Sequence, residues 1–174
     1  MEVKVRDSHV VHQGRLFTMY EETLEFADGH TAPFNYIRHP GACVMLPFAD
    51  DETVLMIRQY RHAIRQYIWE FPAGTIDAGE NPDSCARREL IEETGFAAQH
   101  MDYWGEIFPL PSYSNEGIHV YKACGLTPAH QNLDADEILS VHRVKIADAM
   151  QMAKNGEIID SKTLACLLLV NLHC

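Results

Sequence analysis

Apolar and polar residues alternate through the first 38 residues of the chain in the manner of β-strands. Gly14 interrupts the alternation, and Asp28-Gly29 is a strong signal for a hairpin turn. We therefore predict a small N-terminal antiparallel β subdomain over residues 1–39. Its short strands are expected at residues 3–5, 10–11, 16–18, 23–26 and 34–37.

The hydrophobic pattern changes after His39-Pro40-Gly41, where continuous apolar runs replace the alternation. Residues 42–48 predict a fully apolar strand, and residues 54–60 predict a second strand after a turn. Further short strands are predicted at residues 68–71, 103–108, 117–122 and 138–144.

Two helices are predicted near the C-terminus, over residues 146–155 and from Asp160 or Ser161 to Leu172. The second is apolar almost all round, which predicts that it is buried. Strands and helices mix without the regular alternation of a parallel sheet, so we predict an α+β fold.

Another helix is predicted from Pro82, with Asn81 as its N-cap and Gly95 as the residue that ends it. Glu89, Glu92 and Glu93, at i, i+3 and i+4, share one face of this helix. Each like-charge pair of this kind costs roughly 0.2–0.5 kcal/mol in an isolated helix. The cluster suggests a cation site, although three glutamates alone are more typical of a solvated acidic face.

The spacing around this helix is far more specific than the three acids. Gly74 is followed after five residues by Glu80 and, after seven more, by Arg88-Glu89-Leu90-Ile91-Glu92-Glu93-Thr94-Gly95-Phe96. The probability that seven required residue types all match by chance, for one starting position of the pattern in a sequence, is on the order of 10⁻⁸. The segment resembles, with no departure, the signature box of the Nudix hydrolases, which cleave a nucleoside diphosphate linked to another moiety. The resemblance implies a Nudix-type α/β/α sandwich with a mixed sheet over residues 40–174.

Clustered glutamates without nearby thiols or paired histidines suit Mg²⁺, or Mn²⁺, better than Zn²⁺. A metal held between two phosphates supports hydrolysis of a pyrophosphate bond. The resemblance implies that Glu89, Glu93 and the carbonyl of Ala73 are metal ligands. It also implies that Glu92 is a further ligand or helper and that Arg88 orients the glutamates; otherwise Arg88 forms an ordinary surface ion pair.

Sequence outside the box resembles the ADP-ribose pyrophosphatase branch of this family. One departure is Ser112-Tyr113, where the branch commonly has Pro-Gly. The likeness implies hydrolysis of ADP-ribose to AMP and ribose 5-phosphate by a homodimer that exchanges its N-terminal strands. It rests on the segments His39-Pro40-Gly41-Ala42-Cys43-Val44, Arg58-Gln59-Tyr60-Arg61-His62-Ala63, Trp69-Glu70-Phe71-Pro72-Ala73-Gly74, Pro111-Ser112-Tyr113-Ser114-Asn115-Glu116, His119-Val120-Tyr121-Lys122-Ala123 and Gly156-Glu157-Ile158-Ile159-Asp160-Ser161-Lys162-Thr163.

Several residues are candidates for binding the nucleotide-sugar substrate. Arg61 can donate bidentate hydrogen bonds to a phosphate, or it is a solvated charge at a strand end. Glu116 can accept hydrogen bonds from ribose hydroxyls, or it is a loop charge. Phe34 can stack on an adenine ring, although an aromatic in an alternating strand is more often a core residue. The predicted substrate contacts are completed by Arg38, Ser112 and Thr75.

The expected general base is Glu137, which lies in the acidic segment Asp134-Ala135-Asp136-Glu137 before a strand. The branch resemblance implies a catalytic glutamate on a mobile loop, and such a base can reach its position when substrate closes the site. The alternative is a solvated acidic loop.

Composition excludes several classes of partner. The net charge of −11 over 174 residues argues against DNA or an anionic membrane surface. The cysteines are odd in number and suggest reduced thiols, and no apolar signal region or membrane span is visible, so we expect a cytoplasmic protein. The five cysteines are at positions 43, 85, 124, 166 and 174.

Two rival functions remain open at this point. The same machinery could hydrolyse another nucleotide sugar such as a GDP-hexose, because residues outside the box decide the substrate. The fold could also serve a nucleotide-sensing regulator, but such proteins usually have a damaged box and an attached DNA-binding domain. Here the box is intact, and the chain is acidic and leaves no residues for a helix-turn-helix domain.

Overall fold

The computed structural model describes residues 2–135 and 137–173 of the chain. It divides the chain into two compact units. The first runs to Gly41 and takes in Phe108–Gly117, and the second consists of Ala42–Ile107 and the chain from Ile118 onward. The domain boundary expected at residue 39 and the exchange of strands between subunits stay predictions.

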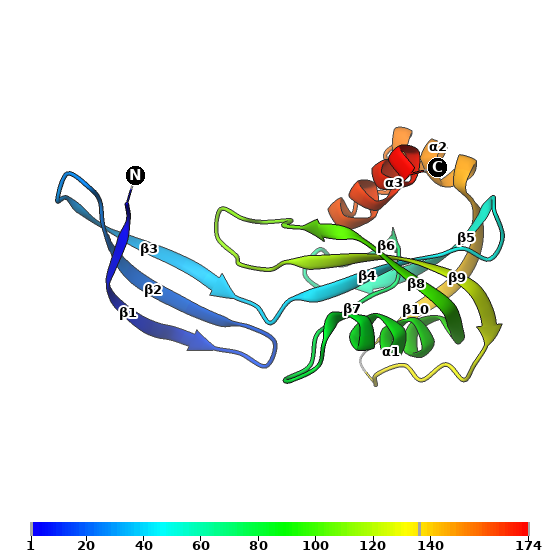
Figure 1. The fold of residues 1–174 in the computed structure, drawn as a ribbon, viewed down its shortest axis with the longest axis horizontal. Helices are drawn as coiled ribbons and strands as arrows, with labels where there is room; N and C mark the ends of the chain where they lie inside the picture. Colours follow the sequence, from blue (N-terminus) through cyan, green and yellow to red (C-terminus); the bar gives the residue numbers. More distant parts are fainter. Residues whose placement is uncertain (1, 136, 174) are drawn as a thin grey trace. The chain divides into compact units, whose positions relative to one another are not determined.

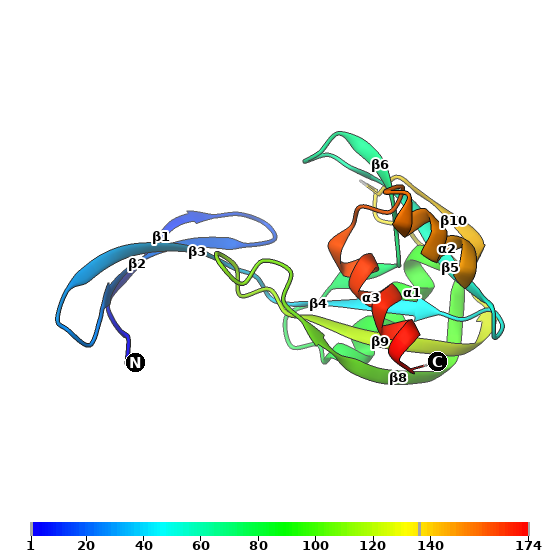
Figure 2. The same cartoon turned by 90° about the horizontal axis from the view of Figure 1, so that it is seen from above.

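The first unit is a three-stranded antiparallel sheet with the order β1-β2-β3 (Figure 2). Gly29, with φ of 86°, makes the tight turn between β2 and β3 that the sequence indicates. The short stretches expected from the alternation are parts of three longer strands. In β1, pairing with β2 continues through two register shifts, so the stretches predicted at residues 3–5 and 10–11 belong to one strand. The strands are β1 (Lys4–Gln13), β2 (Thr18–Glu25) and β3 (Thr31–Arg38).

The first strand of this sheet is exposed along its whole length. Val5, Val10 and Val11 are each at least half exposed, although apolar side chains normally pack against something in a stable sheet. Phe108–Gly117 is joined to β3, because the Ile37 N–H donates to the Tyr113 carbonyl over 2.8 Å. The first unit therefore presents apolar strand surface that its own residues do not cover.

The second unit contains a mixed arrangement of strands. One sheet has the order β7-β4-β9-β8, in which β4 and β9 are parallel and the other neighbours antiparallel, and a second has the antiparallel order β10-β5-β6. This confirms the predicted α+β class with a mixed sheet. The strands are β4 (Ala42–Pro47), β5 (Thr53–Arg61), β6 (Gln66–Glu70), β7 (Ala73–Thr75), β8 (Phe96–Ile107), β9 (Ile118–Pro128) and β10 (Leu139–Lys145).

Helices cover both faces of the strands in the second unit, with α1 on one side and α2 and α3 on the other (Figure 1). None of the helices in the described part of the chain is long and apolar enough to cross a membrane. The helices are α1 (Pro82–Thr94), α2 (Ile146–Lys154) and α3 (Ser161–His173).

Strand β4 is continuously apolar because it is buried on both faces. Cys43 and Met45 pack with Leu90 of α1, and the alternate residues Val44 and Leu46 belong to the cluster that contains α2 and α3. All four strand residues are completely buried. This central strand thus fixes α1, and with it the acidic box, to the sheet.

The prediction that the last helix is buried is wrong for one of its faces. Leu164, Leu168 and Leu172 form an exposed row at four-residue spacing, with exposed fractions rising from 39% to 70%. The opposite face carries the buried residues Thr163, Cys166, Leu167 and Val170. Composition alone could not identify the exposed row, since both faces are apolar.

Candidate active site

Helix α1 has the ends that the sequence predicts. The Asn81 side chain accepts a hydrogen bond from the Ser84 N–H over 2.9 Å, and Pro82 occupies the first turn. Gly95 adopts the left-handed conformation with φ of 73°, and its N–H donates to the Ile91 carbonyl. These caps fix which residues of the helix face the strands.

Glu93 is the most deeply buried of the box glutamates, with 1% of its surface exposed. Its Oε2 accepts a hydrogen bond of 2.8 Å from the Ala73 N–H, which brings together two of the predicted metal ligands. Burial raises the pKa of Glu93 to about 8, the bond from Ala73 opposes this, and the nearby charges of Glu89 and Glu137 raise it further. A cation beside this carboxyl would remove the main cost of ionising it.

Glu89 lies directly against the backbone of β7. A methyl group built on Gly74 would lie 1.8 Å from the Glu89 carboxyl carbon, so only glycine leaves room for this side chain. Burial raises the pKa of Glu89, although hydrogen bonding and charge from Arg88 oppose the rise. The glycine of the box therefore has a direct steric role in placing the first predicted ligand.

Arg88 connects the acids of the box to one another. Its guanidinium donates to both carboxylate oxygens of Glu80 at 2.9 and 2.8 Å, to Glu89 at 2.6 Å and to Glu92 at 2.9 Å. It also donates to the Thr75 carbonyl over 3.2 Å. The bond from Arg88 is the main reason why the pKa of Glu80 falls to about 2. The alternative of one ordinary surface ion pair does not describe this network.

The segment before β10 is tied to the C-terminal end of α1. The Gln131 side chain donates to the Glu93 carbonyl over 2.6 Å, and the Asn132 N–H donates to the Glu92 carbonyl over 3.1 Å. Glu137 accepts a hydrogen bond from the Asp134 N–H, and its charge raises the pKa of Glu93, so it lies near the box. Its role as general base stays a prediction, and its neighbour Asp136 lies outside the described residues.

Sequence reasoning gave no role to Glu70, which is 1% exposed and holds Arg61 in place. Arg61 donates to the two Glu70 oxygens at 2.9 and 2.5 Å, and Lys162 donates to the same carboxylate at 2.9 Å. Burial favours the neutral form of Glu70, but these two cations outweigh it and lower its pKa. The available signal was a glutamate inside an apolar strand, which requires a partner when buried.

Four predicted substrate contacts belong to the first unit rather than to the unit that contains the box. Phe34 is 42% exposed, so it is not the core residue that its alternating strand suggested. Ser112 is exposed, Arg38 donates to the Tyr20 hydroxyl over 3.5 Å, and the Glu116 carboxylate lies 3.9 Å from His39. Their roles in binding stay predictions.

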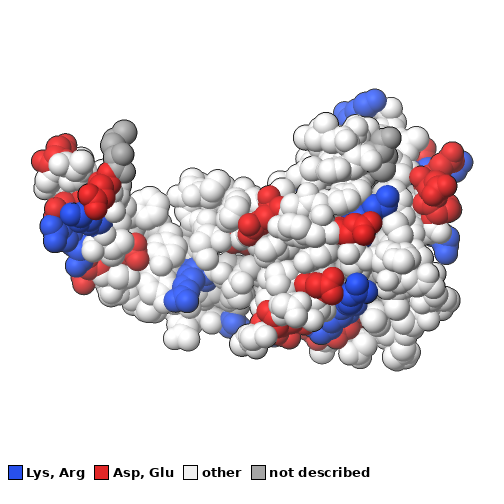
Figure 3. Space-filling view, in the orientation of Figure 1, with Lys and Arg blue, Asp and Glu red and all other residues white. Residues whose placement is uncertain are grey.

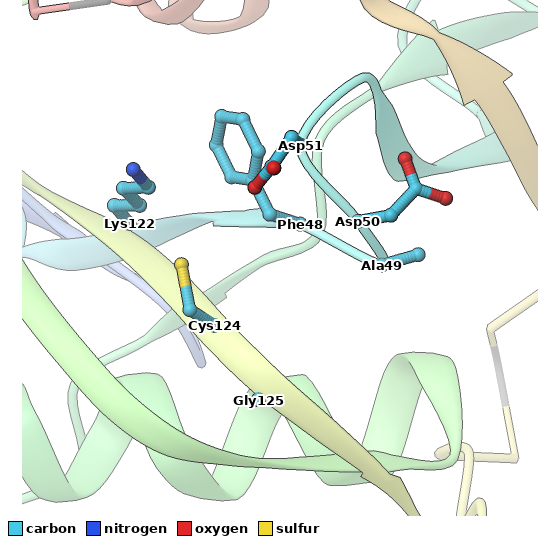
Figure 4. Close-up of a pocket in the computed structure, with 7 residues that line it drawn as sticks. All are labelled: Phe48, Ala49, Asp50, Asp51, Lys122, Cys124 and Gly125. Atoms are coloured by element: carbon cyan, nitrogen blue, oxygen red, sulfur yellow. The ribbon is translucent and has the colours of Figure 1, made fainter.

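Two hollows lie outside the box. One of about 320 Å³ belongs to the first unit and is lined by Glu22, Phe34, Tyr36, Pro111, Tyr113, Ser114 and Asn115. The other, of about 360 Å³, lies in the second unit and contains none of the predicted site residues (Figure 4). It is lined by Phe48, Ala49, Asp50, Asp51, Lys122, Cys124 and Gly125.

Acidic and basic side chains lie in small mixed groups on the face of each unit that Figure 3 shows. Arg6 pairs with Glu25 in the first unit, and Arg87 pairs with Asp83 in the second. In the described part of the chain, the cysteines at positions 43, 85, 124 and 166 form no disulfide bonds, and Cys174 lies outside the described residues.

The donors gathered at the box are suited to a hard divalent cation. All are oxygen atoms, from the carboxylates of Glu89, Glu92 and Glu93 and from the adjacent backbone of Ala73. Across residues 2–135 and 137–173, no group of three or more His, Cys, Asp or Glu side chains is arranged so that it could hold a metal ion. Mg²⁺ does not need such a group, because it binds through one or two carboxylates and completes its shell with water and substrate oxygens.

Comparison with known proteins agrees with this site. Residues 37–166 match the NUDIX domain. The chain is 31% identical to an ADP-ribose pyrophosphatase of Bacillus subtilis over 94% of this chain and 89% of that protein. It is also 31% identical to a methanol dehydrogenase activator of Bacillus methanolicus over 99% of this chain and 94% of that protein. A crystal structure of an ADP compounds hydrolase superposes with a TM-score of 0.86 at 26% identity, covering 98% of this chain and 93% of the other. With an intact box and a domain match over most of its length, the chain belongs to the Nudix hydrolase family.

Proposed function

We propose that the protein hydrolyses the pyrophosphate bond of ADP-ribose in a Mg²⁺-dependent reaction, giving AMP and ribose 5-phosphate. The observation that carries the proposal is the box itself, in which Arg88 joins Glu80, Glu89 and Glu92 beside the buried Glu93. The choice of ADP-ribose is supported by the similar pyrophosphatase of Bacillus subtilis.

In this reaction the oxygen donors of Glu89, Glu93 and Ala73 would hold the metal, and Glu92 would assist them. When bound, Mg²⁺ neutralises charge on the diphosphate and lowers the pKa of an attacking water. Arg88 keeps the carboxylates in a fixed arrangement through its hydrogen bonds, so little reorganisation is needed during reaction. Glu137 takes the proton of the water, and its location near Glu89 and Glu93 supports that role.

The remaining contacts would recognise the two ends of the substrate. Arg61 is held by Glu70 with its side chain 40% exposed, so its guanidinium retains donors for a phosphate. In the first unit, Phe34 lines a hollow with Tyr36 and Tyr113 that suits stacking on a flat base. We assign Glu116 to ribose hydroxyls, with Arg38, Ser112 and the Thr75 backbone as further contacts.

We further propose that the active protein is a homodimer. The exposed valines of β1 leave an apolar strand surface, and a second copy of the chain is the simplest partner that could cover it. Light scattering of the wild type and of Val10→Asp tests this proposal. Dissociation of a wild-type dimer by the substitution supports it, and a wild-type monomer contradicts it.

The substrate is tested by separating reaction products on HPLC with and without Mg²⁺. The panel consists of ADP-ribose, NADH, GDP-mannose and UDP-glucose. The proposal predicts AMP and ribose 5-phosphate from ADP-ribose only when Mg²⁺ is present. If kcat/KM for ADP-ribose is at least tenfold below that of another compound, the substrate assignment is wrong while the pyrophosphatase activity stands.

A nucleotide-sensing regulator is distinguished by Glu93→Gln. The substitution keeps the size of the side chain and its capacity to accept the Ala73 hydrogen bond, but it removes the charge. A hydrolase loses most of its turnover and keeps its fold. Glu106→Gln, on the exposed part of β8, is the matched control and should retain wild-type turnover.

A further inference from the structure

Gln59 is a buried residue whose amide oxygen has no hydrogen-bond partner in the described structure. The residue is 5% exposed, and across residues 2–135 and 137–173 nothing donates a hydrogen bond to its Oε1. Buried polar groups are nearly always paired, because an unmade hydrogen bond is costly. A partner that reaches Gln59 only during the reaction would explain why a polar residue occupies this position.

The register of the strands places Gln59 on the same face as the box-facing cation Arg61. Gln59 lies on β5 between Ile68 of β6 and Leu139 of β10, and Arg61 follows two residues later. Side chains two residues apart point to the same face of a strand. Arg61 on that face bonds Glu70, and its charge lowers the pKa of Glu93 against the effect of burial. Gln59 therefore faces toward the side of the sheet that carries the reactive acids.

Glu137 lies two residues before the neighbouring strand β10. The Tyr60 N–H donates to the Ile138 carbonyl over 2.9 Å, so the antiparallel pairing continues past Leu139 toward Glu137. Extending this register two residues beyond Leu139 would set Glu137 opposite Arg61 and diagonally across from Gln59. Diagonal neighbours in an antiparallel pair are roughly 7–8 Å apart, a distance that long side chains can bridge.

The carboxylate of Glu137 is bonded to its own segment in the structure, where it accepts from the Asp134 N–H over 3.0 Å. To act as a base it must leave that bond and turn toward the box. The Gln59 amide can rotate by half a turn about its last torsion, which exchanges the oxygen and the NH₂ group without changing its shape. The buried end of the amide can then donate a hydrogen bond.

We propose that Gln59 is a positioning residue whose amide N–H binds the carboxylate of Glu137 when that carboxylate leaves the Asp134 backbone. The bond satisfies the buried amide and holds one oxygen of Glu137, which leaves the other to accept the proton of the attacking water. This inference rests on the proposed function, in which Glu137 is the general base.

Gln59→Met separates this role from space filling. Methionine has nearly the same length and shape but cannot donate to a carboxylate, and it removes an unpaired polar group from the interior. If Gln59 only fills space, the variant keeps the wild-type kcat and is at least as stable. If Gln59 positions the base, the variant is equally stable but slow.

The experiment measures kcat and KM for ADP-ribose, together with the Tm, in the full-length wild type, Gln59→Met, Glu137→Gln and the double variant. We expect Gln59→Met to lower kcat at least tenfold, to change KM less than twofold and to leave the Tm unchanged or higher. In the Glu137→Gln background it should lower kcat less than twofold further, because the group it positions is already lost. Gln99→Met, at an exposed position of β8, is the control and should behave as the wild type.

A kcat of Gln59→Met within twofold of the wild type overturns the positioning role, as does a full additional loss in the double variant. Gln59→Leu is measured in parallel, so that a folding failure of one substitution leaves the other to decide. If the wild type hydrolyses no compound of the panel, the proposed function itself is wrong, and the inference fails with it. If the wild type is active and Gln59→Met is equally active, the inference about Gln59 is wrong and the proposed function stands.

Discussion

Replacing Gly74 with alanine tests whether the glycine of the box exists to admit the Glu89 carboxylate. The new methyl group would lie 1.8 Å from the carboxyl carbon and 2.1 Å from Oε1 of Glu89. Non-bonded carbon atoms are normally about 3.5–4.0 Å apart, so the carboxylate must move by roughly 2 Å. It would then leave the 2.6 Å hydrogen bond that it accepts from Arg88.

The expected result is a large loss of activity with little loss of stability. A misplacement of about 1 Å can cost on the order of 100-fold in rate, so we expect kcat/KM to fall at least about 100-fold, or roughly 2.7 kcal/mol. The backbone of Gly74 is outside the left-handed region, and the obstructing group is the end of a flexible side chain. The free energy of unfolding should therefore change by less than about 1 kcal/mol.

Gly79→Ala is the matched control in the same loop. Its methyl group would meet nothing within 4 Å, but its φ of 83° is unfavourable for alanine. It should lose roughly 1–2 kcal/mol of stability while kcat/KM stays within about threefold of the wild type. Steady-state kinetics and urea unfolding of both variants give the comparison. A Gly74→Ala enzyme with wild-type kcat/KM would refute the steric role of this glycine.

Three further predictions concern the charged groups. Arg88→Lys should lower kcat/KM at least about tenfold in steady-state assays, because one ammonium cannot replace the fork that joins three carboxylates; unchanged kinetics would contradict this. Lys162→Met should lower the free energy of unfolding by about 1–3 kcal/mol in urea, and unchanged stability would contradict the pairing with Glu70. Folding lowers the pKa of Glu70, so the stability that its carboxylate contributes is present above its pKa in the unfolded chain and is lost as the pH falls. The Lys162→Met variant should therefore lose less stability than the wild type on acidification. Burial raises the pKa of Glu93 to about 8, so Mn²⁺ must displace the proton of this carboxyl when it binds below that pH. The apparent affinity for Mn²⁺, measured by calorimetry, should therefore rise by up to about tenfold per pH unit between about pH 6 and 8. An affinity that does not change with pH over this range would contradict the prediction.

The box and its helix could be predicted from sequence because their determinants are local. The Asn81 cap, the Gly95 stop and the four-residue periodicity of the glutamates depend only on neighbouring residues. The apolar run that became β4 was equally clear, since a strand buried on both faces needs no alternation.

Features that depend on distant residues could not be predicted in the same way. β8 begins at Phe96 rather than near residue 103, because pairing with β9 extends it through exposed polar positions. Glu70 and Lys162 are far apart in the chain, and only the fold shows that they share one buried ion pair with Arg61. The unpaired amide of Gln59 likewise has no sequence signature.

Metal uptake by the box is the most direct test of the central claim. Titration of the full-length wild type and Glu93→Gln with Mn²⁺, followed by electron paramagnetic resonance, should show a bound ion in the wild type whose affinity falls at least about tenfold in the variant. A non-cleavable ADP-ribose analogue is added in a parallel titration, because substrate oxygens complete the shell of such ions. Equal Mn²⁺ binding by the two proteins, or none by the wild type even with the analogue, would contradict a metal site built on these glutamates.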